Sequence, residues 1–121
     1  MVQTKSNPPL VLGGFSQGAC LALEYAFRGG KVDAVVALTG CRVGTPDCTR
    51  PLATLYNLQV YLTGSDTDPW IPAHAFAQTV EALCVAGARL RAESFPGRAH
   101  KVCAAEIAGL DQMLTTIAAQ Q

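Results

Sequence analysis

A short apolar run that ends at a serine framed by glycines constrains this chain more than any other feature. Residues 10–15 (LVLGGF) lead into Ser16, and an apolar, helix-like segment follows at once at residues 17–23 (QGACLAL). The pattern predicts a strand, a sharp turn and a helix. Such a turn strains the backbone of the serine, so only small residues fit two positions before it, at Gly14, and two after it, at Gly18. The strain points the hydroxyl out of the sheet, where a substrate carbonyl reaches it.

A serine hydroxyl needs a base to take its proton and a third group to orient that base. The chain has two histidines, His74 and His100. His100 follows an alternating strand pattern and a Pro-Gly turn, which places it at the carboxyl end of a strand, where parallel sheets carry their chemistry. His74 follows a proline in a predicted first helical turn, a position that usually faces solvent. We therefore expect His100 to be the base and keep His74 as the less favoured alternative.

Two carboxylates follow the predicted strand at residues 58–63, and each is a candidate for the third group. Asp68 immediately precedes Pro69, which biases its backbone toward an extended conformation and favours it as the acid. Asp66 lies nearer the strand end, where it would cap or brace the loop. A purely structural role, in which both aspartates bind turn amides, stays open. A calcium loop is excluded, because the glycine at position six and the glutamate at position twelve are missing.

Four segments of the chain resemble the phospholipase/carboxylesterase family of α/β-hydrolases, which includes acyl-protein thioesterases and dienelactone-hydrolase-like esterases. Residues 13–19 (GGFSQGA) resemble its nucleophile segment, and residues 37–40 (ALTG) resemble the strand end that usually reads LSG. Residues 64–72 (GSDTDPWIP) are similar to its G-x-x-D-x-x-V-P acid loop, and residues 95–100 (FPGRAH) to its terminal Y-P-G-x-x-H segment. The segments occur in the family's order, and the match to the acid loop implies that Asp68 is the acid.

The resemblance implies a serine carboxylesterase without a cofactor. Ser16 would attack an ester carbonyl, His100 would shuttle the proton, and Asp68 would orient His100. The N–H of Gln17 would support the oxyanion, and water would then hydrolyse an acyl-enzyme on Ser16. Two alternatives remain: an acyl-thioesterase or lysophospholipase on the same triad, and an inactive partner subunit or fragment of a larger hydrolase.

Four side chains are candidates for the walls of an apolar acyl or aryl pocket: Phe15, Trp70, Ile71 and Tyr56. Ordinary core packing is the alternative for each of them, most of all for Phe15 and Ile71, whereas Trp70 is the best placed to meet substrate. The sequence has no basic cluster that would suggest phosphate recognition. We expect small, uncharged esters of short-chain or aromatic acids, including feruloyl-type esters by analogy with the family.

The chain departs from the family ahead of Ser16. Family members carry a further N-terminal half, whose H-G-G-like loop donates one of the two oxyanion N–H groups, whereas nine residues precede the serine's strand here. Loss of one such donor typically lowers turnover by about 10²–10³. The expected consequences are a slow enzyme, a donor from a neighbouring subunit or a rebuilt loop, or a loss of activity.

The hydrophobic pattern predicts a single minimal α/β-hydrolase domain over residues 1–121, with about four parallel strands and three crossover helices in a doubly wound layer. The first helix is apolar nearly all round, which is typical of a buried helix. The segment at residues 41–57 lacks periodicity and is predicted to be a lid or a subunit contact. The predicted strands are 10–12, 32–38, 58–63 and 89–95; the predicted helices are 17–27, 76–86 and a closing helix with Ile107, Leu110, Leu114 and Ile117 on one face.

Composition and strand order together predict self-association. Charged residues make up 15% of the chain, against about 25% in a typical soluble domain, which is few for coating a small monomer. The strand Leu10-Val11-Leu12 is central in the family's order, and here it would be an exposed apolar edge. We therefore expect a homo-oligomer that covers this edge, with a truncated fragment of a larger hydrolase as the rival explanation.

The five cysteines favour a reducing compartment. Cys41 and Cys48 are close enough in sequence to pair, whereas Cys20, Cys84 and Cys103 lie in apolar helical patterns and are expected to be buried, reduced thiols of a cytoplasmic protein. The chain has no C-x-x-C motif and only two histidines, so we expect no metal. It also lacks an apolar signal core and a membrane-spanning run. A net charge of zero favours neither nucleic acid nor anionic membranes as partners.

Overall fold

The computed structural model describes residues 8–42 and 54–120. Within these residues, four strands form one parallel sheet in the order β1-β2-β3-β4, as expected for a minimal α/β-hydrolase layer. Most of the predicted lid or contact segment lies outside the described residues, and so does Cys48. The elements are β1 (Val11–Phe15), α1 (Gln17–Phe27), β2 (Ala34–Leu38), β3 (Gln59–Gly64), α2 (Ala73–Val85), β4 (Arg89–Ser94) and α3 (Ala104–Ala119).

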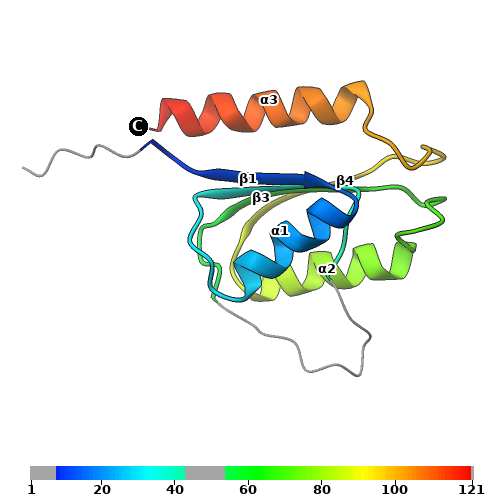
Figure 1. The fold of residues 1–121 in the computed structure, drawn as a ribbon, viewed down its shortest axis with the longest axis horizontal. Coiled ribbons are helices and arrows are strands. Elements are labelled where there is room, and N and C mark those ends of the chain that lie inside the picture. The colour runs from blue at the N-terminus through cyan, green and yellow to red at the C-terminus, as the bar shows by residue number, and fades with distance from the viewer. Residues whose placement is uncertain (1–7, 43–53, 121) are drawn as a thin grey trace, which may run out of the picture.

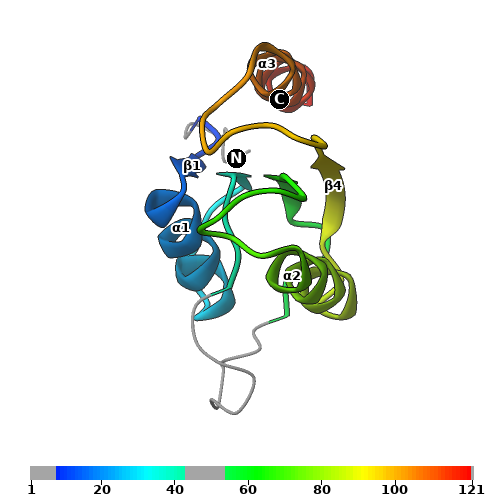
Figure 2. The ribbon, with the colours of Figure 1, turned by 90° about the vertical axis from the view of Figure 1, so that its right-hand side faces the viewer.

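The helices cover both faces of the sheet. Figures 1 and 2 show α1 and α2 together on one face and α3 alone on the other. Helix α1 connects β1 to β2, and α2 connects β3 to β4. The prediction of three crossover helices is wrong for the last one, because α3 follows the final strand and leads to no further strand of the described sheet. The layer is nevertheless covered on both faces, which a parallel sheet requires.

The larger core lies between the sheet and the pair α1 and α2. It contains Leu23 and Phe27 from α1, Leu62 from β3 and Leu83 from α2, each no more than 1% exposed. Strand β2 is buried along its whole length, because it has a strand on each side and a helix layer on each face. This double burial explains why its sequence, AVVAL, is continuously apolar rather than alternating.

Helix α3 packs on the opposite face with only part of the predicted side. Ile107 and Leu114 are 47% and 41% exposed, so the predicted face is wrong at these two positions. Ile117 is buried as predicted, and Leu110 packs against the small core of Val36, Leu38 and Tyr61. The other buried residues of α3 are Glu106 and Gly109. The phenol of Tyr61 lies against the helix at Gly109, where a Cβ atom would sit 2.4 Å from the Tyr61 oxygen. The close approach of a large side chain therefore sets the rotation of this helix.

The outer side of β1 and α1 carries exposed apolar side chains. Strand β1 is an edge of the described sheet, and Leu10, just before it, is 56% exposed. Leu21 and Tyr25 of α1 are 62% and 49% exposed, so the prediction of a helix buried all round is wrong: α1 buries only the side that packs on β1 and β2. We call Leu10, Phe15, Leu21 and Tyr25 the open flank.

Cys20, Cys84 and Cys103 are free thiols, and Cys20 and Cys103 are only partly buried, less than expected. Cys84 is exposed, contrary to the expectation of burial, because only Thr79 and Leu83 of α2 are buried. Within residues 8–42 and 54–120, no three histidine, cysteine or acidic side chains cluster as metal ligands. In the same ranges, no helix is both long and apolar enough to cross a membrane.

Candidate active site

Ser16 lies at the sharp turn between β1 and α1. Its φ is 57°, in the left-handed region that residues other than glycine rarely adopt. Two backbone hydrogen bonds hold the turn: the Ser16 N–H donates to the Leu38 carbonyl at 2.9 Å, and the Ser16 carbonyl accepts from the Cys20 N–H at 3.0 Å. The strained turn is therefore fixed both to the end of β2 and to the first turn of α1.

The two glycines around Ser16 are not equivalent. A Cβ atom on Gly14 would lie 2.3 Å from the carbonyl carbon of Gly18, so a side chain is excluded there. A Cβ atom on Gly18 would meet no described atom within 4 Å. The expectation that both positions need a small residue is thus correct for Gly14 and wrong for Gly18, which points away from the described packing.

The structure brings Ser16, Asp68 and His100 together. His100 lies in the loop after β4, and its Nε2 is 2.7 Å from Ser16 Oγ. Its Nδ1 is 2.7 Å from Asp68 Oδ2. Because the strands are parallel, the loops after β1, β3 and β4 meet at the same edge of the sheet, which is where the three side chains converge.

The Asp68 carboxylate is fully buried and well supplied with donors. Its Oδ1 accepts the amide hydrogens of Trp70 at 2.7 Å and Ile71 at 2.9 Å. Burial alone would raise the pKa of Asp68, but the hydrogen bonds from His100 and from these two amides outweigh it and hold the pKa below its ordinary value. An ionised Asp68 can only accept, so Nδ1 of His100 carries the proton. Nε2 then has a lone pair to take the proton of Ser16.

The two less favoured candidates lie elsewhere. His74 is exposed in the first turn of α2. Asp66 is also exposed, and its Oδ1 accepts the N–H of Gly97 at 2.8 Å. Gly97 has a φ of 73°, a conformation that suits glycine, in the turn that leads to His100. Asp66 therefore braces the His100 loop, whereas the sequence suggested that it would cap or brace its own loop after β3.

The predicted substrate-binding side chains separate into two groups. Phe15 and Trp70 are 38% and 72% exposed, and their ring centroids lie 5.1 and 6.4 Å from that of His100. Ile71 is 8% exposed and packs into the protein. Tyr56 lies before β3 and beside Gly87, at the amino ends of the strands, so its expected place near Ser16 is wrong. Only Phe15 and Trp70 present exposed surface beside the imidazole.

Gln17 is the first residue of α1 and is exposed. The first N–H groups of a helix have no partner within the helix, so they are available to an anion. Gln17 directly follows Ser16, so its N–H is one of these available helix donors and lies next to the serine in the chain.

Sequence reasoning missed a buried polar network behind the His100 loop. It contains Arg98 and Glu106, whose side chains are 7% and 0% exposed. Glu106 stands three residues after Cys103, the N-cap of α3, and that capping spacing is the one hint in the sequence. Nothing in the pattern indicates that Arg98 turns inward, because a loop arginine ordinarily faces water.

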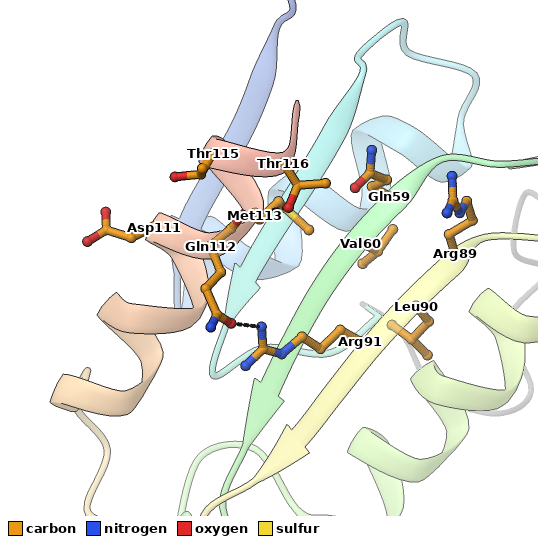
Figure 3. A pocket seen from close by; sticks show the side chains of 10 residues that line it. All are labelled: Gln59, Val60, Arg89, Leu90, Arg91, Asp111, Gln112, Met113, Thr115 and Thr116. Carbon is orange, nitrogen blue, oxygen red and sulfur yellow. Dashed lines mark hydrogen bonds between the residues drawn. The ribbon is translucent and has the colours of Figure 1, made fainter. Parts of the chain in front are cut away.

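Two hollows of the described chain lie away from Ser16. The larger, about 720 Å³, lies between α3 and the strands β3 and β4, and its lining includes Arg89, Arg91 and Met113. Figure 3 shows the Arg91 side chain directed toward Gln112 of α3, to which it donates a hydrogen bond. The smaller hollow lies beside Tyr56 at the amino ends of the strands. Neither is lined by Ser16, Asp68 or His100.

Comparison with solved structures supports the same fold. A phospholipase/carboxylesterase from Dyadobacter fermentans is 29% identical with a TM-score of 0.79, over 84% of this chain and 50% of that one. The esterase PE8 is 25% identical with a TM-score of 0.74, over 88% of this chain and 49% of that one. A Bacillus cereus carboxylesterase shares the fold at 19% identity and a TM-score of 0.76, over 88% and 49%.

The chain thus spans about half the length of these relatives. The sequence profile of the Phospholipase/Carboxylesterase family matches residues 4–118, which is nearly all of the sequence given. Together with the four-stranded parallel layer, this match makes the assignment: the chain belongs to the phospholipase/carboxylesterase family of α/β-hydrolases.

Proposed function

We propose that this chain carries the catalytic centre of a serine carboxylesterase. The observation that carries the proposal is the unbroken path of 2.7 Å contacts from Ser16 through His100 to Asp68, which begins at a strained turn. Membership of a hydrolase family supports the same reading. A buried carboxylate, an oriented imidazole and an exposed hydroxyl in this order are what nucleophilic acyl transfer requires.

The reaction proceeds in two halves. Ser16 Oγ attacks the ester carbonyl while Nε2 of His100 takes its proton, and the N–H of Gln17 stabilises the oxyanion. The imidazolium then gives that proton to the leaving alcohol. Water then attacks the acyl group on Ser16 while Nε2 of His100 takes one of its protons. The imidazolium returns this proton to Ser16 Oγ as the bond to the acyl group breaks, which releases the acid and restores the enzyme. Asp68 stays ionised throughout and stabilises the imidazolium that forms.

The substrates proposed are small, uncharged esters of short-chain or aromatic acids, with feruloyl-type esters among them. Support comes from the exposed rings of Phe15 and Trp70 beside His100, which offer apolar surface next to the reacting atoms. Arg98, in the loop that leads to His100, turns its guanidinium into the protein. An uncharged acyl group therefore matches the apolar surface that Phe15 and Trp70 present beside His100.

The test is hydrolysis of a short-chain p-nitrophenyl ester by wild type and Ser16→Ala. We expect activity in wild type that disappears in Ser16→Ala and in His100→Ala, while His74→Ala, an exposed histidine away from the site, stays like wild type. Equal rates with and without Ser16, or no labelling of Ser16 by a fluorophosphonate, would overturn the proposal.

We further propose that copies of this chain associate through the edge formed by Leu10-Val11-Leu12. The support is the place of β1 at the edge of the described sheet and the exposed apolar side chains of the open flank. Unpaired strand edges with apolar neighbours favour pairing with another chain. The neighbouring copy would cover an apolar surface next to the turn that holds Ser16.

A further inference from the structure

The loop that carries His100 is held from beneath by one buried side chain. Arg98 Nη1 donates to the carbonyl of Ala99 at 2.7 Å and to the carbonyl of Lys101 at 2.6 Å. These are the residues immediately before and after His100. A single nitrogen thus fixes the backbone on both sides of the imidazole.

The other end of the guanidinium reaches the neighbouring elements. Arg98 Nη2 donates to Thr39 Oγ1 at 2.8 Å, at the end of β2, and Nε lies 3.4 Å from Glu106 Oε1 at the start of α3. The backbone carbonyl of Arg98 accepts from Ser65 Oγ at 2.8 Å, in the loop that carries Asp68. Arg98 therefore connects the His100 loop with three other parts of the fold.

Glu106 anchors this arginine. Its carboxylate is fully buried, accepts the hydroxyl of Thr63 and accepts the N–H of Cys103 at 2.8 Å. A buried carboxylate without a countercharge is strongly destabilising, and Arg98 supplies the charge here. The fork geometry of the guanidinium also allows it to serve several acceptors at once, which a lysine ammonium on a flexible stem does not.

From this arrangement we propose that Arg98 is a positioning residue, which sets the height and orientation of His100 between Ser16 and Asp68. The inference rests on the proposed esterase function for its kinetic consequence only. Reacting groups that are displaced by about 1 Å lose on the order of 10²-fold in rate. The geometric claim is that the imidazole moves when the Arg98 guanidinium is lost, and it can be tested whether or not the protein hydrolyses esters.

The decisive variant is Arg98→Lys, which keeps a positive charge near Glu106 and removes the fork. We expect kcat to fall by roughly 10- to 100-fold with KM unchanged, because ester binding does not involve Arg98. The downfield Nδ1–H proton resonance of His100, which reports its hydrogen bond to Asp68, should broaden or disappear. The matched control is Arg91→Lys: Arg91 pairs with Glu93 and Gln112 away from the loop, and this variant should behave as wild type.

Each outcome decides the inference. A resonance that persists unchanged in Arg98→Lys overturns it, even if the melting temperature falls, because the arginine would then only stabilise the fold. If wild type hydrolyses no ester, the proposed function fails, and the resonance alone still tests the positioning role. If Arg98→Lys does not fold, Thr39→Val replaces it, since this isosteric change removes the shorter of the two hydrogen bonds of Nη2 and keeps both charges. The resonance should broaden in this variant too, and an unchanged resonance overturns the inference.

Discussion

The two sides of the candidate site are built differently. On the side of β3, β4 and α3, side-chain and backbone contacts fix the acid and the base: Asp68 accepts two amide hydrogens, and the His100 loop is held by the buried Arg98 and by the exposed Asp66. On the side of β1 and α1, the open flank exposes four apolar side chains, and Gly18 has no described atom near its Cβ direction. Contacts among the described residues thus hold the acid and the base in place. The open flank, next to the turn that carries Ser16, is left uncovered by the described residues.

The contrast follows from packing. Strand β4 is also an edge, but the chain after it crosses back over the sheet to α3, and the buried ion pair of Arg98 and Glu106 holds this loop against the start of the helix. Among the described residues, no strand pairs with β1 on its outer side. The side with the buried network should therefore respond to single substitutions with large losses, and the open flank with small ones.

The largest contrast is expected between the two aspartates of the acid loop. In Asp68→Asn, the side-chain NH₂ can donate to Nδ1 of His100, which favours the tautomer with the proton on Nε2 and leaves no base for Ser16. We therefore expect kcat/KM to fall by about 10³–10⁴. Asp66→Asn keeps an oxygen acceptor for the Gly97 N–H, and its activity should stay close to that of wild type. Steady-state ester hydrolysis measures both. A larger loss in the Asp66 variant would reverse the assignment of the acid.

The second contrast concerns the glycines around Ser16. Gly14→Ala forces a Cβ to 2.3 Å from the Gly18 backbone, so we expect the free energy of unfolding to fall by about 3 kcal/mol. Gly18→Ala meets no described atom and lies in the first turn of α1, so it should raise that free energy by up to about 1 kcal/mol. Urea unfolding of the two variants compares them directly. A large loss in Gly18→Ala would mean that the position is covered after all.

Much of the fold, and less of the site, follows from local pattern. The turn at Ser16 and the four strands are visible because each short apolar run is bounded by glycine, proline or polar residues. Asp68 is distinguished by Pro69, a local effect. The rotation of α3 is only partly visible, in Leu110 and Ile117, because it also depends on the close approach of the Tyr61 phenol to Gly109, which is distant in sequence. The burial of Arg98 and Glu106 was not predicted for the same reason, because it depends on tertiary packing. The capping spacing between Cys103 and Glu106 is its only trace in the sequence.

The third prediction tests the open flank through assembly. Light scattering of the protein at micromolar concentration should give a mass larger than one chain, and Leu10→Lys should lower that mass because a charge disfavours pairing at an exposed strand edge. Lys31→Ala, a change at an exposed polar position before β2, is the matched control and should leave the mass unchanged. A stable monomer in wild type would contradict the prediction.

The smallest effect is expected at the edge of the buried side. Tyr61 donates its hydroxyl to Glu93 Oε1 at 2.6 Å, and this bond holds the pKa of Glu93 below its ordinary value against the opposing effect of burial. Tyr61→Phe should lower the free energy of unfolding at neutral pH by about 1 kcal/mol. The contribution is present above the ordinary carboxyl pKa and is lost as the pH falls through the lowered pKa of Glu93, so the difference between variant and wild type should shrink in acid. Urea unfolding at several pH values measures it, and a difference that grows in acid would contradict the assignment.

The hydrogen bond between Ser16 and His100 joins residues 84 positions apart. Ser16 is synthesised before its base, which follows β4. Contacts of such long sequence separation are slow to form, because the intervening chain must first be ordered. Reactivity at Ser16 is therefore a reporter of folding of this layer: a growing or refolding chain acquires it only once the loop after β4 has reached the turn between β1 and α1.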